Sequence, residues 1–86
     1  SRAFPNPVSQ GGSFNLNIAM KEHVTATLLL LDTQAEVKKE YSLAPGVVSH
    51  LAIPTQDLSP GLYRVFLYTS DGQYAYGDVL ISSTGR

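Results

Sequence analysis

Hydrophobic and polar side chains alternate along most of the chain. The clearest run is 13–20, in which Phe14, Leu16, Ile18 and Met20 share one side. A period of two residues predicts β-strands with one buried face, and no segment shows the period of a helix. The prolines of 4–8 favour an extended segment there. The remaining strand-like runs are 24–31, 36–43, 47–53, 62–69 and 74–82.

Turn-forming residues separate these runs at intervals of about 8–12 residues, which is typical of β-sandwiches. We therefore expect an all-β fold, an immunoglobulin-like antiparallel β-sandwich of about seven strands. The length of 86 residues allows one domain, which we place over 1–86. The charged run 36–43 suits a sheet edge, with Val37, Tyr41 and Leu43 as its anchors.

The segment 57–82 is the one around which we expect the fold to be organised. It reads as two strands joined at Ser70-Asp71-Gly72. A two-residue loop would turn Asp78 toward the core, where an unpaired carboxylate is costly. A three-residue loop with Gly72 at positive φ avoids that cost. We therefore predict the three-residue loop.

This register assigns the side chains of the hairpin to two faces. Tyr63 lies on the inner face and, as in a tyrosine corner, its hydroxyl should bond to upstream backbone. We expect the rest of that face to seal the core. Its other members are Val65, Leu67, Ala75, Gly77, Val79 and Ile81. The predicted outer pairs are Arg64 with Asp78, Phe66 with Tyr76, and Tyr68 with Tyr74.

Run 24–31 has one face that begins polar and ends apolar, at Leu29 and Leu31. A central strand covered on both sides would explain this, and so would an apolar patch at one end. If Leu29 and Leu31 lie beside the hairpin, they join Phe66, Tyr68, Tyr74 and Tyr76 in one exposed face. Three interpretations stay open for it: ordinary strand propensity, a contact surface for a partner or for a second copy of the chain, and a carbohydrate platform.

Composition narrows the function classes. Charged residues make up 15% of the chain and the formal net charge is −1, which argues against nucleic acid as a partner. There is no cysteine and no apolar run long enough for a transmembrane segment. His23 and His50 lack nearby acidic partners, and Asp57 is expected to cap a turn. We therefore expect no enzyme activity, cofactor or metal site.

Two short motifs resemble those of a known family. Phe4-Pro5-Asn6-Pro7 resembles the opening of the type A C-terminal sorting domains of the type IX secretion system in Bacteroidetes. The block 58–65, with Gly61, Tyr63 and Val65, is similar to that family's Gly-x-Tyr-x-Val block, and Val24 to Asp32 is similar to its middle strand. The last strand departs from the family, because Tyr76, Gly77 and Asp78 stand where lysine and valine tend to alternate.

The resemblance implies a sandwich domain that ends an exported protein and addresses it across the outer membrane to the cell surface. Its partners would be the outer-membrane secretion machinery and a surface sortase. Without the resemblance, the alternative is a structural or adhesive accessory sandwich of a larger surface protein, with weak carbohydrate binding as a variant.

Overall fold

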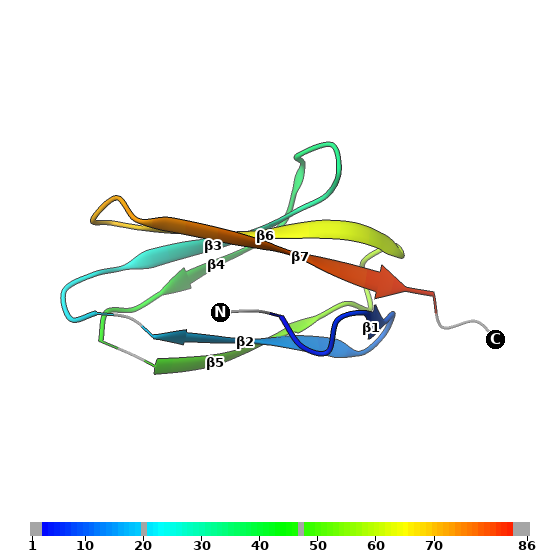
Figure 1. Cartoon of the computed structure of the whole chain (residues 1–86), viewed down its shortest axis with the longest axis horizontal. Coiled ribbons are helices and arrows are strands. Elements are labelled where there is room, and N and C mark those ends of the chain that lie inside the picture. The colour runs from blue at the N-terminus through cyan, green and yellow to red at the C-terminus, as the bar shows by residue number, and fades with distance from the viewer. Residues whose placement is uncertain (1–2, 20, 47, 84–86) are drawn as a thin grey trace.

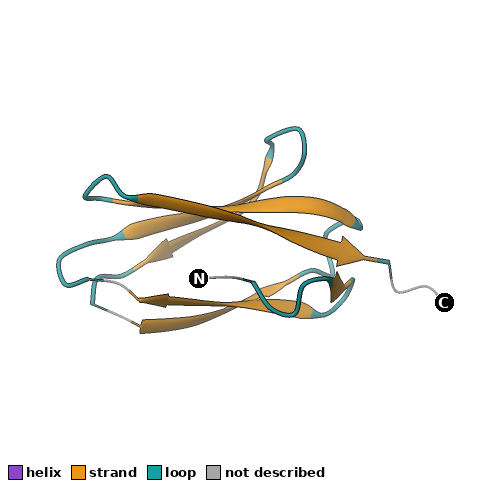
Figure 2. Cartoon of the chain, in the orientation of Figure 1, coloured by secondary structure: helices purple, strands orange, loops and turns teal. Residues whose placement is uncertain are grey.

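The computed structural model describes residues 3–19, 21–46 and 48–83. These residues form an all-β fold with seven strands and no helix, as predicted (Figures 1 and 2). Since no helix is present among them, none could cross a membrane. The strands are β1 (Val8–Ser9), β2 (Ser13–Ala19), β3 (Ala26–Leu31), β4 (Val37–Leu43), β5 (Val48–Pro54), β6 (Gly61–Thr69) and β7 (Tyr74–Ser82).

The strands form two layers, a five-stranded sheet in the order β1-β7-β6-β3-β4 and a two-stranded sheet of β2 and β5 (Figure 1). The third, sixth and seventh strands share one sheet and the second and fifth the other, and two such layers are compatible with a β-sandwich. The charged strand β4 lies at a sheet edge, as its sequence predicted. One pairing differs from the antiparallel expectation, because β1 runs parallel to β7 at Val8–Ile81.

The hairpin of β6 and β7 has the predicted register. Arg64 pairs with Asp78, and the two aromatic pairs follow on the same face. Gly72 has a φ of 90°, and the Thr69 amide donates to the Gln73 carbonyl at 2.9 Å to close the three-residue loop. The three-residue loop is therefore confirmed, and the Asp78 carboxylate lies outside the core.

The opening segment is bent, where its prolines had suggested an extended course. Phe4 pairs with Asn15 of β2, whereas Val8, four residues later, pairs with β7 of the other sheet. The chain bends over Pro5–Pro7, and the peptide bonds before both prolines are cis. The segment thus crosses from one layer to the other, which an extended strand in one sheet could not do.

Two further expectations were wrong. Val37 is not a buried anchor: an irregularity in the pairing at Leu30/Leu31 shifts it out of step, and it is 48% exposed. Asp57 does not cap a turn, because its carboxylate pairs with Lys39 of β4 at 3.0 Å. The run 24–31 had two explanations, a central strand covered on both sides and an apolar patch at one end. Strand β3 is central in its sheet, yet Leu29 and Leu31 are only half-buried. No second layer of the described strands covers them, so the apolar patch is the better explanation.

The core is densest where β1 and the turn after it close one end of the sandwich. Phe14, Ile53, Val79 and Ile81 are at most 1% exposed there. The buried Thr55 hydroxyl accepts from the Gly11 amide and donates to the Gly12 carbonyl at 2.9 Å, which fixes the β1–β2 turn to the end of β5. Hydrogen bonding of this kind makes the burial of a polar group tolerable.

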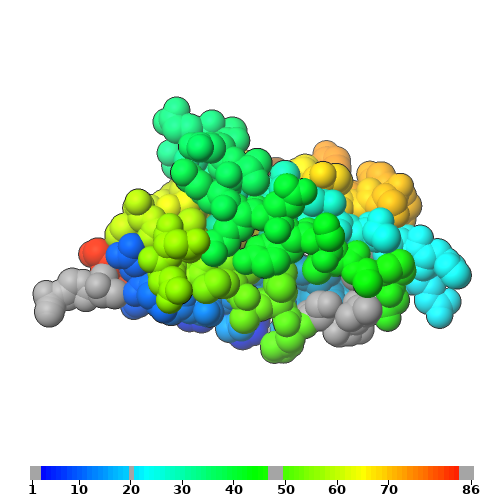
Figure 3. Space-filling view, turned by 180° about the vertical axis from the view of Figure 1, so that it is seen from behind, coloured from blue at the N-terminus to red at the C-terminus, as the bar shows by residue number. Residues whose placement is uncertain are grey.

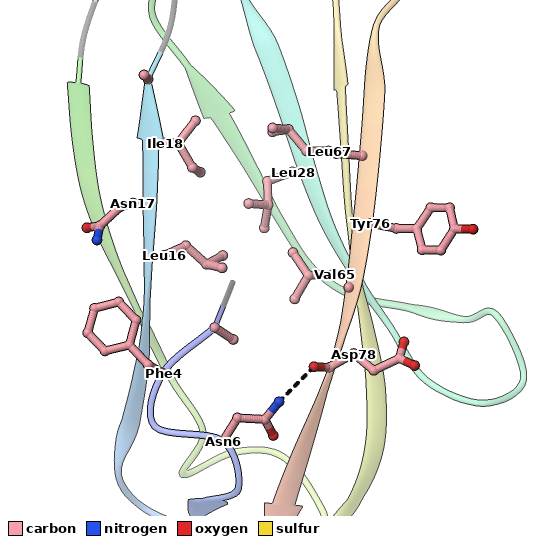
Figure 4. A pocket seen from close by; sticks show the side chains of 14 residues that line it. Phe4, Asn6, Leu16, Asn17, Ile18, Leu28, Val65, Leu67, Tyr76 and Asp78 are labelled. Carbon is pink, nitrogen blue, oxygen red and sulfur yellow. Dashed lines mark hydrogen bonds between the residues drawn. The ribbon is translucent and has the colours of Figure 1, made fainter. Parts of the chain in front are cut away.

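The inner face of the hairpin seals the core at Tyr63, Val65, Val79 and Ile81, as expected, but the other end of the sandwich is open beside Ala75 and Gly77. Ala75 and Gly77 are exposed, although they share a face with the buried Val79. They line a cleft of about 720 Å³ between β2 and β7 (Figure 4). Ala75 and Gly77 stay exposed because, among the described residues, β1 pairs with β7 only at Ile81 and Ser82.

The opposite side has a different shape. Seen from behind, the green side chains of β4 and β5 cover the molecule, and the turn between β3 and β4 projects from it (Figure 3). Figure 1 shows the same turn rising above the outer face of the five-stranded sheet.

Candidate protein-contact face

The outer face of the five-stranded sheet carries the residues that the sequence singled out. We call Phe66, Tyr68, Tyr74, Tyr76, Leu29 and Leu31 the aromatic face. Because β3 pairs with β6, Leu29 lies beside Phe66 and Leu31 beside Arg64. Because β6 pairs with β7, the tyrosines of β7 continue the face toward the sheet edge. The structure therefore brings all six residues together.

The rings of the aromatic face contact one another in tilted arrangements. The centroid of Phe66 lies 5.8 Å from that of Tyr68 and 6.0 Å from that of Tyr74. Such pairs add roughly 0.5–1.5 kcal/mol beyond the area that they bury. Phe66 is half-buried at the centre, whereas Tyr74 and Tyr76 are 69% and 62% exposed. The face thus has a packed centre and an exposed rim of tyrosines.

Arg64 and Asp78 form an ion pair next to these rings. Arg64 Nε donates to Asp78 Oδ1 at 2.9 Å, and the guanidinium carbon lies 4.7 Å from the centroid of Tyr76. The hydrogen bond to Asp78 raises the pKa of Arg64 above its ordinary value. The pair is half exposed and contributes little to stability, and it engages both charged groups nearest the rings. This arrangement suits contact with a protein better than recognition of a polar sugar.

Two further apolar residues extend the aromatic face, and our sequence analysis did not include them. Leu62 and Leu80 are paired across β6 and β7, and both are more than 40% exposed. The alternation along β6 was a sufficient signal for Leu62, because it stands two residues before Arg64. Among the apolar residues of the hairpin on that face, we had included only the aromatic ones.

A turn gives this end of the face its concave shape. Asp32 Oδ1 accepts from the amides of Gln34 and Glu36, and Ala35 takes a φ of 64°. The hydrogen bond from Glu36 is the main reason why the pKa of Asp32 is lowered. This turn between β3 and β4, which the Asp32 carboxylate stabilises, borders a hollow of about 350 Å³. The other walls of the hollow include Leu62 and Arg64. A partner's side chain could enter this hollow from the aromatic face.

The residues that carry the family resemblance have structural positions. Asn6 donates to the Asp78 carbonyl at 3.0 Å and accepts from the Leu80 amide at 3.0 Å. Gly61 begins β6 at a φ of 150°, and the buried Tyr63 donates its hydroxyl to the Ser59 carbonyl at 2.7 Å, the bond expected of a tyrosine corner. The opening motif and the Gly-x-Tyr-x-Val block therefore meet at the hairpin.

His23 and His50 are exposed, the first at a turn and the second on β5. Among the described residues, no group of three or more His, Cys, Asp or Glu is placed to hold a metal ion.

No protein-family model matches the chain, and no curated protein or solved structure matches it either. The geometry itself therefore carries the functional argument, and it offers a contact surface.

Proposed function

We propose that this chain is a non-catalytic C-terminal secretion and sorting domain, which directs an exported cargo protein across the outer membrane to the cell surface. The observation that carries the proposal is the double hydrogen bond of Asn6 to β7. It joins the Phe4–Pro7 motif to β7, the partner of the strand that carries the Gly-x-Tyr-x-Val block. The two motifs that resemble the sorting domains of the type IX secretion system are therefore parts of one hairpin and its attachment. A folded domain of this kind suits an export signal that the secretion machinery recognises by the domain's surface and not as a linear peptide.

The structural role of the motifs indicates where the secretion machinery would bind. Tyr63 and Val65 are buried, and Asn6 is held by backbone groups of β7. Recognition would therefore use other residues, and the aromatic face is a partly exposed apolar surface that β3, β6 and β7 present together. Aromatic residues are enriched in the cores of protein interfaces. We infer that the outer-membrane machinery contacts this face, with a surface sortase acting on the domain afterwards.

The test is export of a reporter fused ahead of residues 1–86 in a Bacteroidetes host. We expect the fused reporter at the cell surface and the reporter alone in the periplasm. The double variant Phe66→Ser/Tyr76→Ser should lower surface display at least about tenfold, which corresponds to the loss of a single interface hot spot. His50→Ser, on the exposed face of β5, is the matched control and should leave display unchanged.

Folding must be separated from recognition in this assay. Circular dichroism and protease resistance of the purified variants show whether the sandwich persists. A folded parent domain that leaves its reporter in the periplasm would contradict the proposal and favour an accessory sandwich of a larger surface protein. Normal display of a folded Phe66→Ser/Tyr76→Ser variant would remove the aromatic face from recognition.

A further inference from the structure

The free edge of β7 is a feature that the proposed function does not use. On one side β7 pairs with β6 along its whole length. On its other side, among the described residues, it pairs with β1 only at Ile81 and Ser82. An unpaired strand edge presents a row of backbone donors and acceptors to any chain that approaches in an extended form.

The hydrogen bonds of Asn6 show which backbone groups face that edge. The carbonyl of Asp78 and the amide of Leu80 both point to Asn6, away from β6. In an antiparallel pair the residues of a strand alternate between the two sides. The amides and carbonyls of Tyr74 and Tyr76 therefore point to the same edge, together with the amide of Asp78. No described strand or side chain hydrogen-bonds to these groups.

A cleft with both apolar and polar lining residues lies directly beside this edge. Figure 4 shows Leu16 and Ile18 of β2 pointing across it toward Leu28, Val65 and Leu67 of the facing sheet. The side chains of Tyr76 and Asp78 point away, so β7 contributes small residues and backbone to the wall (Figure 4). A Cβ built on Gly77 would meet no atom within 4 Å. The cleft of about 720 Å³ is within the range of ligand sites, roughly 300–1,000 Å³.

We propose that the cleft and the free edge of β7 bind an extended peptide segment as an added strand, with apolar residues at alternate positions. Its backbone would bond to Tyr74, Tyr76 and Asp78, and every second side chain would enter the cleft. Affinity would come from main-chain bonds and specificity from the cleft, as in other cases of strand addition. This inference is independent of the export role and of the aromatic face.

Two observations favour a peptide over a second copy of the chain. The site continues an interface that the chain itself uses, because Asn6 and β1 already occupy the same edge further along. A second β7 laid on this edge would bring only Ala75 and Gly77 to the inner side, and these would leave the cleft empty. The lining also lacks an unpaired charge, since the Asp78 carboxylate is bound to Arg64. The middle of the peptide should therefore be uncharged.

The test uses the full chain and a blocked peptide of alternating threonine and valine with a lysine at each end. Titration followed by NMR should shift the amide signals of Tyr74, Tyr76 and Asp78. Only one alternate set of peptide amides can face β7. N-methylation of that set should weaken binding at least about tenfold, whereas N-methylation of the other set should be tolerated.

Protein variants test the cleft separately. Gly77→Val places a branched side chain in the open space and should also weaken binding at least about tenfold. Leu62→Ser, on the outer face of the same sheet, is the matched control and should bind like the parent. The dispersion of the NMR spectrum shows that each variant is folded.

Four outcomes of the peptide experiments would overturn the inference. They are no shift of the edge amides, equal binding by both N-methylated peptides, unchanged binding by Gly77→Val, and shifts confined to Leu29, Leu31, Phe66 and Tyr68. If the edge amides instead shift with protein concentration in the absence of peptide, a second copy occupies the edge and the peptide proposal is wrong.

Discussion

The two ends of the β6–β7 hairpin have the same alternation of residues and very different environments. At the closed end, Val79 and Ile81 are 0% and 1% exposed beneath β1 and the turn that Thr55 holds. At the open end, Ala75 and Gly77 lie on the same face of the same strand and remain exposed. The difference lies in what runs beside the strand, because among the described residues β1 pairs with β7 at one end only. An inner face is therefore buried only where another segment covers it.

The largest expected effect is the loss of stability when a core side chain is truncated at the closed end, compared with the same change beside the cleft at the open end. Phe14→Ala removes a fully buried ring and should lower the free energy of unfolding by about 3–5 kcal/mol. Leu67→Ala, beside the cleft, should cost less than about 2 kcal/mol, because Leu67 is only half-buried. Urea unfolding of both variants measures the difference, and Phe14→Leu replaces Phe14→Ala if that variant does not fold. Equal losses would show that the open end is as well packed as the closed end.

Asn6 stands at the boundary between the two ends. Asn6→Ala removes both of its hydrogen bonds to β7, and we expect a loss of about 1–2 kcal/mol in the free energy of unfolding. The amide of Leu80 should then exchange faster with solvent, because its acceptor is gone. Asn17→Ala, exposed on β2, is the control. Unchanged protection of Leu80 in Asn6→Ala would mean that Asn6 does not hold the edge.

Two glycine-to-alanine substitutions, one beside the cleft and one in the hairpin loop, should change the free energy of unfolding in opposite directions. Gly77→Ala should raise the free energy of unfolding by about 0.4–1 kcal/mol, because its Cβ meets no neighbour and the unfolded chain loses freedom. Gly72→Ala should lower it by about 1 kcal/mol or more, because the loop requires a φ of 90°. Thermal unfolding distinguishes the two. A loss of stability in Gly77→Ala would show that the cleft is closed in solution.

The smallest effect concerns the hairpin loop at the open end. The hydrogen bond from the Thr69 hydroxyl lowers the pKa of the Asp71 carboxyl. This stabilisation is present above the ordinary pKa of about 3.9 and is lost as pH falls through the lowered value. The protection of the loop amides against hydrogen exchange, relative to their intrinsic rates, should therefore fall below about pH 4, and Asp71→Asn should remove most of that pH dependence. The Thr55 network, which contains no carboxylate, should be unaffected over the same range.

Several features of the fold followed from local patterns alone. The period of two residues identified the strands, and the cost of burying Asp78 selected the three-residue loop of the hairpin. That choice fixed the pairing of Arg64 with Asp78 and so the composition of the aromatic face. These inferences held because alternation and turn geometry act over a few neighbouring residues.

Other features required contacts between distant segments. Asn6 is bonded to residues 72 and 74 positions away, and the crossing of Phe4–Val8 between layers depends on both sheets being in place. The irregularity that exposes Val37 and the pairing of Asp57 with Lys39 likewise depend on neighbours that no local pattern specifies.

The sequence by itself determined the strands, the faces of the hairpin and the grouping of aromatic side chains on one of them, because side-chain alternation is a property of each strand. Only the tertiary structure decided where the sandwich closes and where it stays open. Burial depends on which segment lies across a face, and that segment comes from far away in the chain.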